Sequence, residues 1–122
     1  MLIRGRAGSG KSALALQLLA FGGSLVADDR TRLWREAGVL WADAPAPIRG
    51  VVEARGVGLL NAPPAGPARL SLILDLDRPE AERLPPCRQE RLLDVALPLA
   101  GNPGGPHLPA AIHAYLVHGR HG

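Results

Sequence analysis

The segment GRAGSGKS, residues 5–12, limits most strongly what this chain can fold into. It matches the pattern GxxxxGK[ST], a loop whose backbone N–H groups surround phosphate groups. Such a loop binds phosphate where it joins a strand to the N-terminus of a helix, because the amides there point at the anion. The motif therefore predicts a strand before residue 5, a helix after residue 10 and a nucleotide site between them.

The flanking residues agree with this prediction. MLIR at 1–4 is a short apolar strand candidate, and KSALALQLLA at 11–20 has the apolar spacing of a helix. The next apolar run, SLVADD at 24–29, is expected to be a strand that runs parallel to the first. Together these segments predict the strand, loop, helix and strand unit in which the motif usually occurs.

The remaining chain shows hairpin, strand and helix patterns. A hairpin is expected at 31–44, around Ala-Gly, and a loop leading into a strand at 48–62. Strong apolar patterns predict single strands at 69–77 and 90–100. The last apolar segment, 108–119, predicts a helix that prolines help to start.

Composition favours a soluble, single-domain chain in the cytoplasm. The 122 residues are 47% hydrophobic and 20% charged, which suits one globular domain. No apolar run reaches the roughly 18–20 residues of a membrane helix, and a single cysteine excludes an internal disulfide framework. The net charge is +3, but the basic residues are scattered without interleaved aromatics, so we expect no nucleic-acid partner and no membrane.

The loop holds the only lysine among fourteen basic residues, Lys11. A compact ammonium is the group that reaches the terminal phosphates of a bound nucleotide, while the hydroxyl of Ser12 is placed to bind Mg²⁺. We therefore expect ATP and Mg²⁺ as cofactors. The expected nucleotide-binding residues are Gly5, Arg6, Ala7, Gly8, Ser9, Gly10, Lys11 and Ser12.

Acidic residues follow at two places. Asp28 and Asp29 end the expected strand at 24–29, and adjacent strand residues point to opposite faces. One of the two could face the metal while the other accepts a proton from an incoming hydroxyl. Glu53, in EARG, could bind Mg²⁺. The alternatives at this point are a solvated strand end for the aspartates and a surface ion pair for Glu53.

In this order and spacing, GRAGSGKS, LVADD and RGVVEARGVGLLN resemble the catalytic domain of HPr kinase/phosphorylase. The resemblance covers roughly residues 1–100, is strongest over 5–60, and is closest to the short alphaproteobacterial forms. It implies an α/β fold, a P-loop kinase domain with a mixed central sheet, here as a single domain over 1–122. The chain begins four residues before the loop, so we expect an N-terminally short form.

The resemblance also implies roles for individual residues. Lys11 would contact the phosphates, and Ser12 with Glu53 would hold Mg²⁺. Asp29 would accept the proton of the acceptor serine, and Asp28 would support the metal and the geometry. A further match, Arg83 in AERL, would stabilise the transferred phosphate.

The activity implied is that of a serine protein kinase acting on HPr, or an HPr-like phosphocarrier, and so regulating the phosphotransferase system. In the family the same site also acts as a phosphorylase, which the lack of Lys or Arg in LAGNPGGPH disfavours here. Two alternatives stay open: a small-molecule P-loop kinase, with the segment at 30–43 as its lid, and a non-catalytic nucleotide sensor. The oligomeric state is left open, with a homo-oligomer as one alternative.

Overall fold

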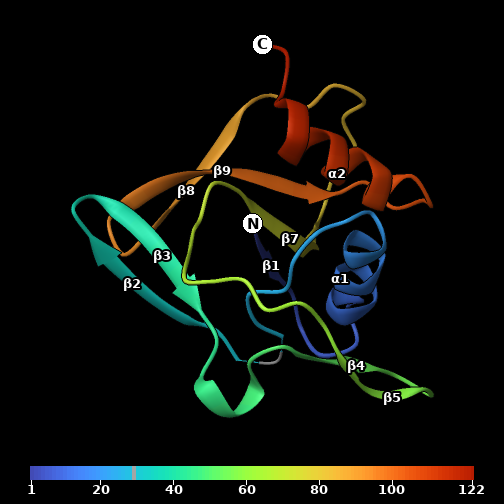
Figure 1. Ribbon diagram of the computed structural model, residues 1–122. Coiled ribbons are helices and arrows are strands. Elements are labelled where there is room, and N and C mark those ends of the chain that lie inside the picture. Colours follow the sequence, from blue (N-terminus) through green and yellow to red (C-terminus); the bar gives the residue numbers. More distant parts are fainter. Residues whose placement is uncertain (29) are drawn as a thin grey trace.

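The computed structural model describes residues 1–28 and 30–122, which form a mixed α/β fold (Figure 1). Two helices and a set of short strands follow one another along the chain. In chain order the elements are β1 (Leu2–Arg4), α1 (Lys11–Ala20), β2 (Arg32–Glu36), β3 (Val39–Asp43), the 3-10 turn η1 (Ala46–Ile48), β4 (Val51–Ala54), β5 (Gly58–Asn61), β6 (Ala68–Arg69), β7 (Ile73–Pro79), β8 (Arg88–Leu92), β9 (Val95–Asn102) and α2 (Leu108–His118).

The central sheet has the strand order β1-β7-β9-β8. β1 runs parallel to β7 and β7 parallel to β9, while β8 and β9 are antiparallel. The expected mixed sheet is therefore confirmed. The parallel neighbour of β1 is β7, with Ile3 paired to Leu74.

The segment at 24–28 does not form the expected strand, and residue 29 lies outside the described residues. Leu25 makes an isolated parallel bridge with Pro64: its N–H donates to the carbonyl of Pro63, and its own carbonyl accepts from Ala65. Two consecutive prolines have no N–H to donate, so the facing segment cannot extend this bridge into a ladder. The expected strand at 24–29 was therefore wrong for residues 24–28, although Leu25 is buried, with 5% of its surface exposed.

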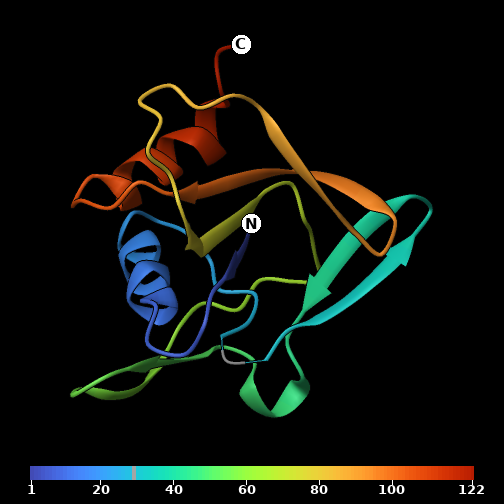
Figure 2. The same cartoon turned by 180° about the vertical axis from the view of Figure 1, so that it is seen from behind.

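Each face of the central sheet packs against a different layer. Leu74 of β7 is fully buried against Leu14 of α1 and Ile112 of α2. The preceding residue, Ile73, points to the opposite face and packs with Leu40 of β3. Figure 1 and the reverse view in Figure 2 show both helices beside the sheet on one side and the β2–β3 hairpin on the other.

Two sequence expectations for the outer elements are confirmed. The hairpin at 31–44 is β2 and β3, and its turn places Ala37 and Gly38 at φ angles of 51° and 75°. Trp34 pairs directly with Trp41 across this hairpin, as expected for packing residues. The terminal helix is α2, and none of the described helices has the length and apolar character needed to cross a membrane.

Two segments expected to contain one strand each are hairpins. The segment 90–100 is the end of β8, a turn at Leu93 and Asp94, and most of β9. Both turn residues have positive φ, 47° and 62°, a conformation usually signalled by glycine or asparagine, which are absent here. The segment 48–62 likewise holds the β4–β5 hairpin, which projects beyond α1 in Figure 1.

A partly buried charge cluster joins the two edges of the central sheet. The guanidinium of Arg4, on β1, donates to Asp75 of β7 at 3.0 Å and also pairs with Glu90 of β8. The hydrogen bond from Arg4 to Glu90 lowers the pKa of Glu90, and burial raises this pKa by a smaller amount. The pKa of Glu90 therefore lies below its usual value. Glu90 therefore stabilises the fold in its ionised form.

We expect this contribution to disappear in acid. A carboxyl whose folded pKa is depressed adds stability above its unfolded pKa, and loses it as the pH falls through the folded pKa. Arg4→Met should lower the free energy of unfolding by up to about 1 kcal/mol at about pH 7, and by less at about pH 3. Urea unfolding at both pH values measures this. Arg35→Met, which removes an exposed pair with Asp94, is the control; an equal effect of Arg4→Met at both pH values would contradict the assignment.

Candidate functional site

Residues 5–12, hereafter the phosphate loop, connect β1 to the first turn of α1. Gly10 caps the helix in the left-handed conformation, at φ 98°, and among residues 1–28 and 30–122 no side chain caps α1. The first amides of α1 are therefore left for another acceptor. The ammonium of Lys11 folds back over the loop and donates to the carbonyls of Gly5 and Arg6 at 2.6 and 3.1 Å. This places a positive charge and free amides together, which suits an anion.

The carboxyl end of β7 holds the first half of the phosphate loop. Asp77 accepts a hydrogen bond from the backbone N–H of Arg6 at 2.7 Å, and Asp75 accepts one from the N–H of Asp77 at 2.9 Å. Sequence reasoning missed this role for Asp77. The available signal was an acidic residue at the end of the buried LILDLD strand, but it becomes meaningful only once β7 is known to neighbour β1.

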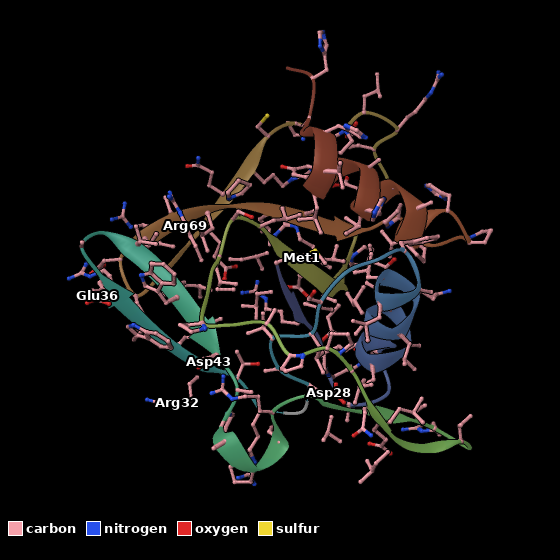
Figure 3. The ribbon with its side chains drawn as sticks, in the orientation of Figure 1. Met1, Asp28, Arg32, Glu36, Asp43 and Arg69 are labelled. Carbon is pink, nitrogen blue, oxygen red and sulfur yellow. The ribbon has the colours of Figure 1, made fainter. Side chains whose placement is uncertain are left out.

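Asp28 joins two of the residues predicted for the site. Its Oδ1 accepts a hydrogen bond from the Ser12 hydroxyl at 2.9 Å, and its Oδ2 accepts one from the backbone N–H of Glu53 at 2.9 Å. Figure 3 shows Asp28 near the N-terminal end of α1, close to β4. The structure therefore brings the loop serine, the first aspartate and the EARG segment into one place.

The chemistry of this group suits Mg²⁺. Ser12 and Asp28 offer a hydroxyl and a carboxylate within hydrogen-bond distance of each other, and the side chain of Glu53 is exposed on the adjoining strand. Mg²⁺ takes oxygen ligands and is commonly held by one or two carboxylates together with substrate phosphates and waters. Among the described residues no three His, Cys, Asp or Glu side chains form a metal cluster, so the protein would supply only part of the ligand set.

A cavity of about 470 Å³ opens beside this group. Lys11, Ser12 and Asp28 line this cavity together with the hydroxyls of Ser24 and Thr31, and apolar side chains such as Leu18 and Leu25 complete its wall. A phosphate bound by the loop would meet Ser12 and Asp28 on this side.

Asp29 and Arg83 are the remaining residues predicted for the site. Asp29 lies outside the described residues. Arg83 is exposed in the segment between β7 and β8, and within residues 1–28 and 30–122 it forms no hydrogen bond or salt bridge. Nearby, Cys87 contacts Gly122, beyond the C-terminal end of α2. The catalytic role of Arg83 stays a prediction.

Comparison with known proteins gives a family match over the N-terminal half. The family model of the HPr Serine kinase C-terminal domain matches residues 1–65. The HPr kinase/phosphorylase of Bordetella pertussis is 47% identical over 62 residues, which is 50% of this chain and 20% of that protein. The HPr kinase/phosphorylase of a Geobacillus species is 41% identical over 85 residues, or 63% of this chain and 27% of that protein. The matched regions thus span 20% and 27% of these relatives.

A solved structure extends the likeness to most of the chain. The HPr(Ser) kinase/phosphatase of Coxiella burnetii superposes with a TM-score of 0.74 at 28% sequence identity. The match covers 93% of this chain and 83% of the solved chain. The C-terminal half, where the family model does not match, therefore shares this fold as well.

The Asp28 contacts predict a specific change in hydrogen exchange. Asp28→Ala removes the acceptor of the Glu53 amide, so we expect exchange at Glu53 to accelerate by roughly tenfold, as loss of one hydrogen bond would produce. Native-state exchange measured by NMR tests this. Asp77→Ala is the matched control, because it should expose the amide of Arg6 and leave Glu53 protected. Unchanged exchange at Glu53 in Asp28→Ala would contradict the contact.

Proposed function

This chain belongs to the HPr Serine kinase C-terminal domain family, and from that premise we propose that it is an ATP-dependent serine protein kinase. The observation that carries the proposal is the Asp28 carboxylate, which bonds to both Ser12 and the backbone of Glu53. The loop serine, an aspartate and the EARG acid are the group that a kinase of this family needs beside its phosphate loop. A generic phosphate site would need only the loop.

The binding half of the proposal rests on the phosphate loop. Its amides and the ammonium of Lys11 would take the ATP phosphates, with Lys11 exchanging the carbonyls of Gly5 and Arg6 for phosphate oxygens. Ser12 and Glu53 would hold Mg²⁺, and Asp28 would orient the serine hydroxyl. When bound, Mg²⁺ neutralises charge on the transferred phosphoryl group.

For the phosphoryl-transfer step, we assign Asp29 as the general base. An acceptor serine loses its hydroxyl proton to this carboxylate as its oxygen bonds to the γ-phosphorus, and the bond from that phosphorus to the ADP oxygen breaks. Asp28 is already occupied by two hydrogen bonds, which favours its neighbour as the base. The assignment of Asp29 rests on its position in ADD and on the family resemblance.

The proposed acceptor is a serine of HPr or of an HPr-like phosphocarrier, and the proposed outcome is regulation of the phosphotransferase system. The support is the name shared by the relatives, HPr kinase/phosphorylase. Because the matches cover 20% and 27% of those proteins, the acceptor and the reverse reaction are proposals for this chain.

The binding half predicts a loss of nucleotide affinity in Lys11→Ala. Removing the ammonium should weaken ATP·Mg²⁺ binding by about 1.5–3 kcal/mol, the usual size of a charged hydrogen bond. Isothermal titration calorimetry measures this, with Arg120→Ala in the C-terminal tail as the control. If Lys11→Ala and wild type bind ATP·Mg²⁺ with equal affinity, the phosphate loop is not the nucleotide-binding site.

The transfer half predicts that Asp29→Asn separates chemistry from binding. The amide keeps the shape but cannot accept the serine proton, so transfer to HPr should fall about 10²- to 10⁴-fold, while ATP affinity stays as in wild type. Labelled ATP with HPr from the same cell measures transfer, and Asp94→Asn in the exposed β8–β9 turn is the control. If Asp29→Asn transfers phosphate at the wild-type rate, Asp29 is not the base. If wild type binds ATP but does not label HPr, the protein is a nucleotide sensor and not a kinase.

A further inference from the structure

A second cavity, of about 230 Å³, lies against the phosphate loop. The loop contributes Ser9 and Gly10, and α1 contributes Ala13 and Gln17, which are exposed residues on one side of the helix. The opposite wall is the segment 105–109, which leads into α2. None of Lys11, Ser12 and Asp28 lines this cavity, so it is distinct from the cavity beside the metal-binding group.

The lining of this cavity combines apolar surface with a few polar groups. Leu76, Pro106 and Leu108 supply flat apolar surface. The Ser9 hydroxyl is enclosed, and among the described residues it has no hydrogen-bond partner. The Asn102 amide makes two hydrogen bonds within the protein: it donates to the Leu76 carbonyl at 3.3 Å and accepts from the Gly104 N–H at 3.0 Å. These bonds hold the segment after β9 against the end of β7.

The two cavities meet the phosphate loop at different residues: the first at Lys11 and Ser12, the second at Ser9 and Gly10. The γ-phosphate end of a nucleotide would lie on the side of Ser12 and Asp28, because Mg²⁺ held there would neutralise the charge of the terminal phosphates. A triphosphate chain bound in that direction must leave the loop on the other side. That exit leads to Ser9 and Gly10, which form the loop end of the second cavity.

We propose that the second cavity binds the nucleoside end of the nucleotide, its ribose and purine base. This inference rests on the proposed function and extends it to the ribose and base of the substrate. A nucleoside is smaller than the drug-sized ligands that fill cavities of roughly 300–1,000 Å³, so the size is suitable. The base would lie between Ala13 on α1 and the wall at 105–109, with the Gln17 amide near its polar edge.

The test fills the cavity and compares two ligands. Ala13→Leu adds a larger side chain on an exposed, helix-favouring position, so the fold should tolerate it. We expect this variant to bind ATP·Mg²⁺ roughly tenfold or more weakly, because the nucleoside meets the added side chain. Its affinity for inorganic tripolyphosphate with Mg²⁺ should stay at the wild-type value, because that probe has no nucleoside. Ala20→Leu, at the other end of α1 and outside both cavities, should change neither affinity.

Calorimetry with both ligands separates the possible results. Wild-type ATP affinity in Ala13→Leu would overturn the proposal, and so would an equal loss for ATP and tripolyphosphate, since that would indicate a distorted loop. Gln17→Ala provides a second reading without added bulk: a loss confined to ATP supports the proposal, and an equal loss for both ligands opposes it. If wild type binds ATP no more tightly than tripolyphosphate, the assignment of the second cavity to the nucleoside is wrong, while the assignment of the phosphates to the phosphate loop is supported. If wild type binds neither, the proposed function itself fails.

Discussion

Two hydrogen bonds accepted by the Asp28 carboxylate hold the candidate site together. They connect the first turn of α1, through Ser12, with strand β4, through the backbone of Glu53. These segments are 16 and 25 residues away from Asp28 in the chain. A carboxylate has two oxygens with several acceptor positions, so one side chain can bridge a hydroxyl and an amide without leaving either unsatisfied. The bridge adds a polar contact to the β4–β5 hairpin, whose Val52 is buried with Leu25, Leu16 and Leu19.

A second aspartate holds the phosphate loop from the sheet side. Asp77 binds the amide of Arg6, and its own amide is bound by Asp75, which in turn pairs with Arg4 immediately before the loop. The start of the loop is thus fixed to the end of β7, while its last residue is fixed by Asp28. Both ends of the loop are thus held, while the Lys11 ammonium, among the described residues, bonds only to the loop carbonyls of Gly5 and Arg6. Such preorganisation reduces the entropic cost of ordering a binding loop when an anion arrives.

Local sequence signals predicted the local elements well. The helix at 11–20 coincides with α1 because the glycine loop before it and the Gly-Gly pair after it define both ends. The β2–β3 hairpin was predictable because Ala-Gly sits between two short alternating runs. The turn at Leu93 and Asp94 was not, because its positive φ angles are imposed on residues that carry no turn signal. The antiparallel pairing of β8 with β9 supplies the energy that holds the turn in this conformation.

The sequence by itself determined the phosphate loop and the helix that follows it, because each depends on residues within about a dozen positions of one another. It also determined the family resemblance, which rests on three short motifs in a fixed order between residues 5 and 61. Only the tertiary structure decided that β7 lies beside β1, because strand order follows from the packing of whole layers. The same holds for Asp77 and for the cavity between α1 and the segment 105–109. These features bring together residues some 70 to 100 positions apart, and no local pattern records such contacts, because they follow from strand order and layer packing.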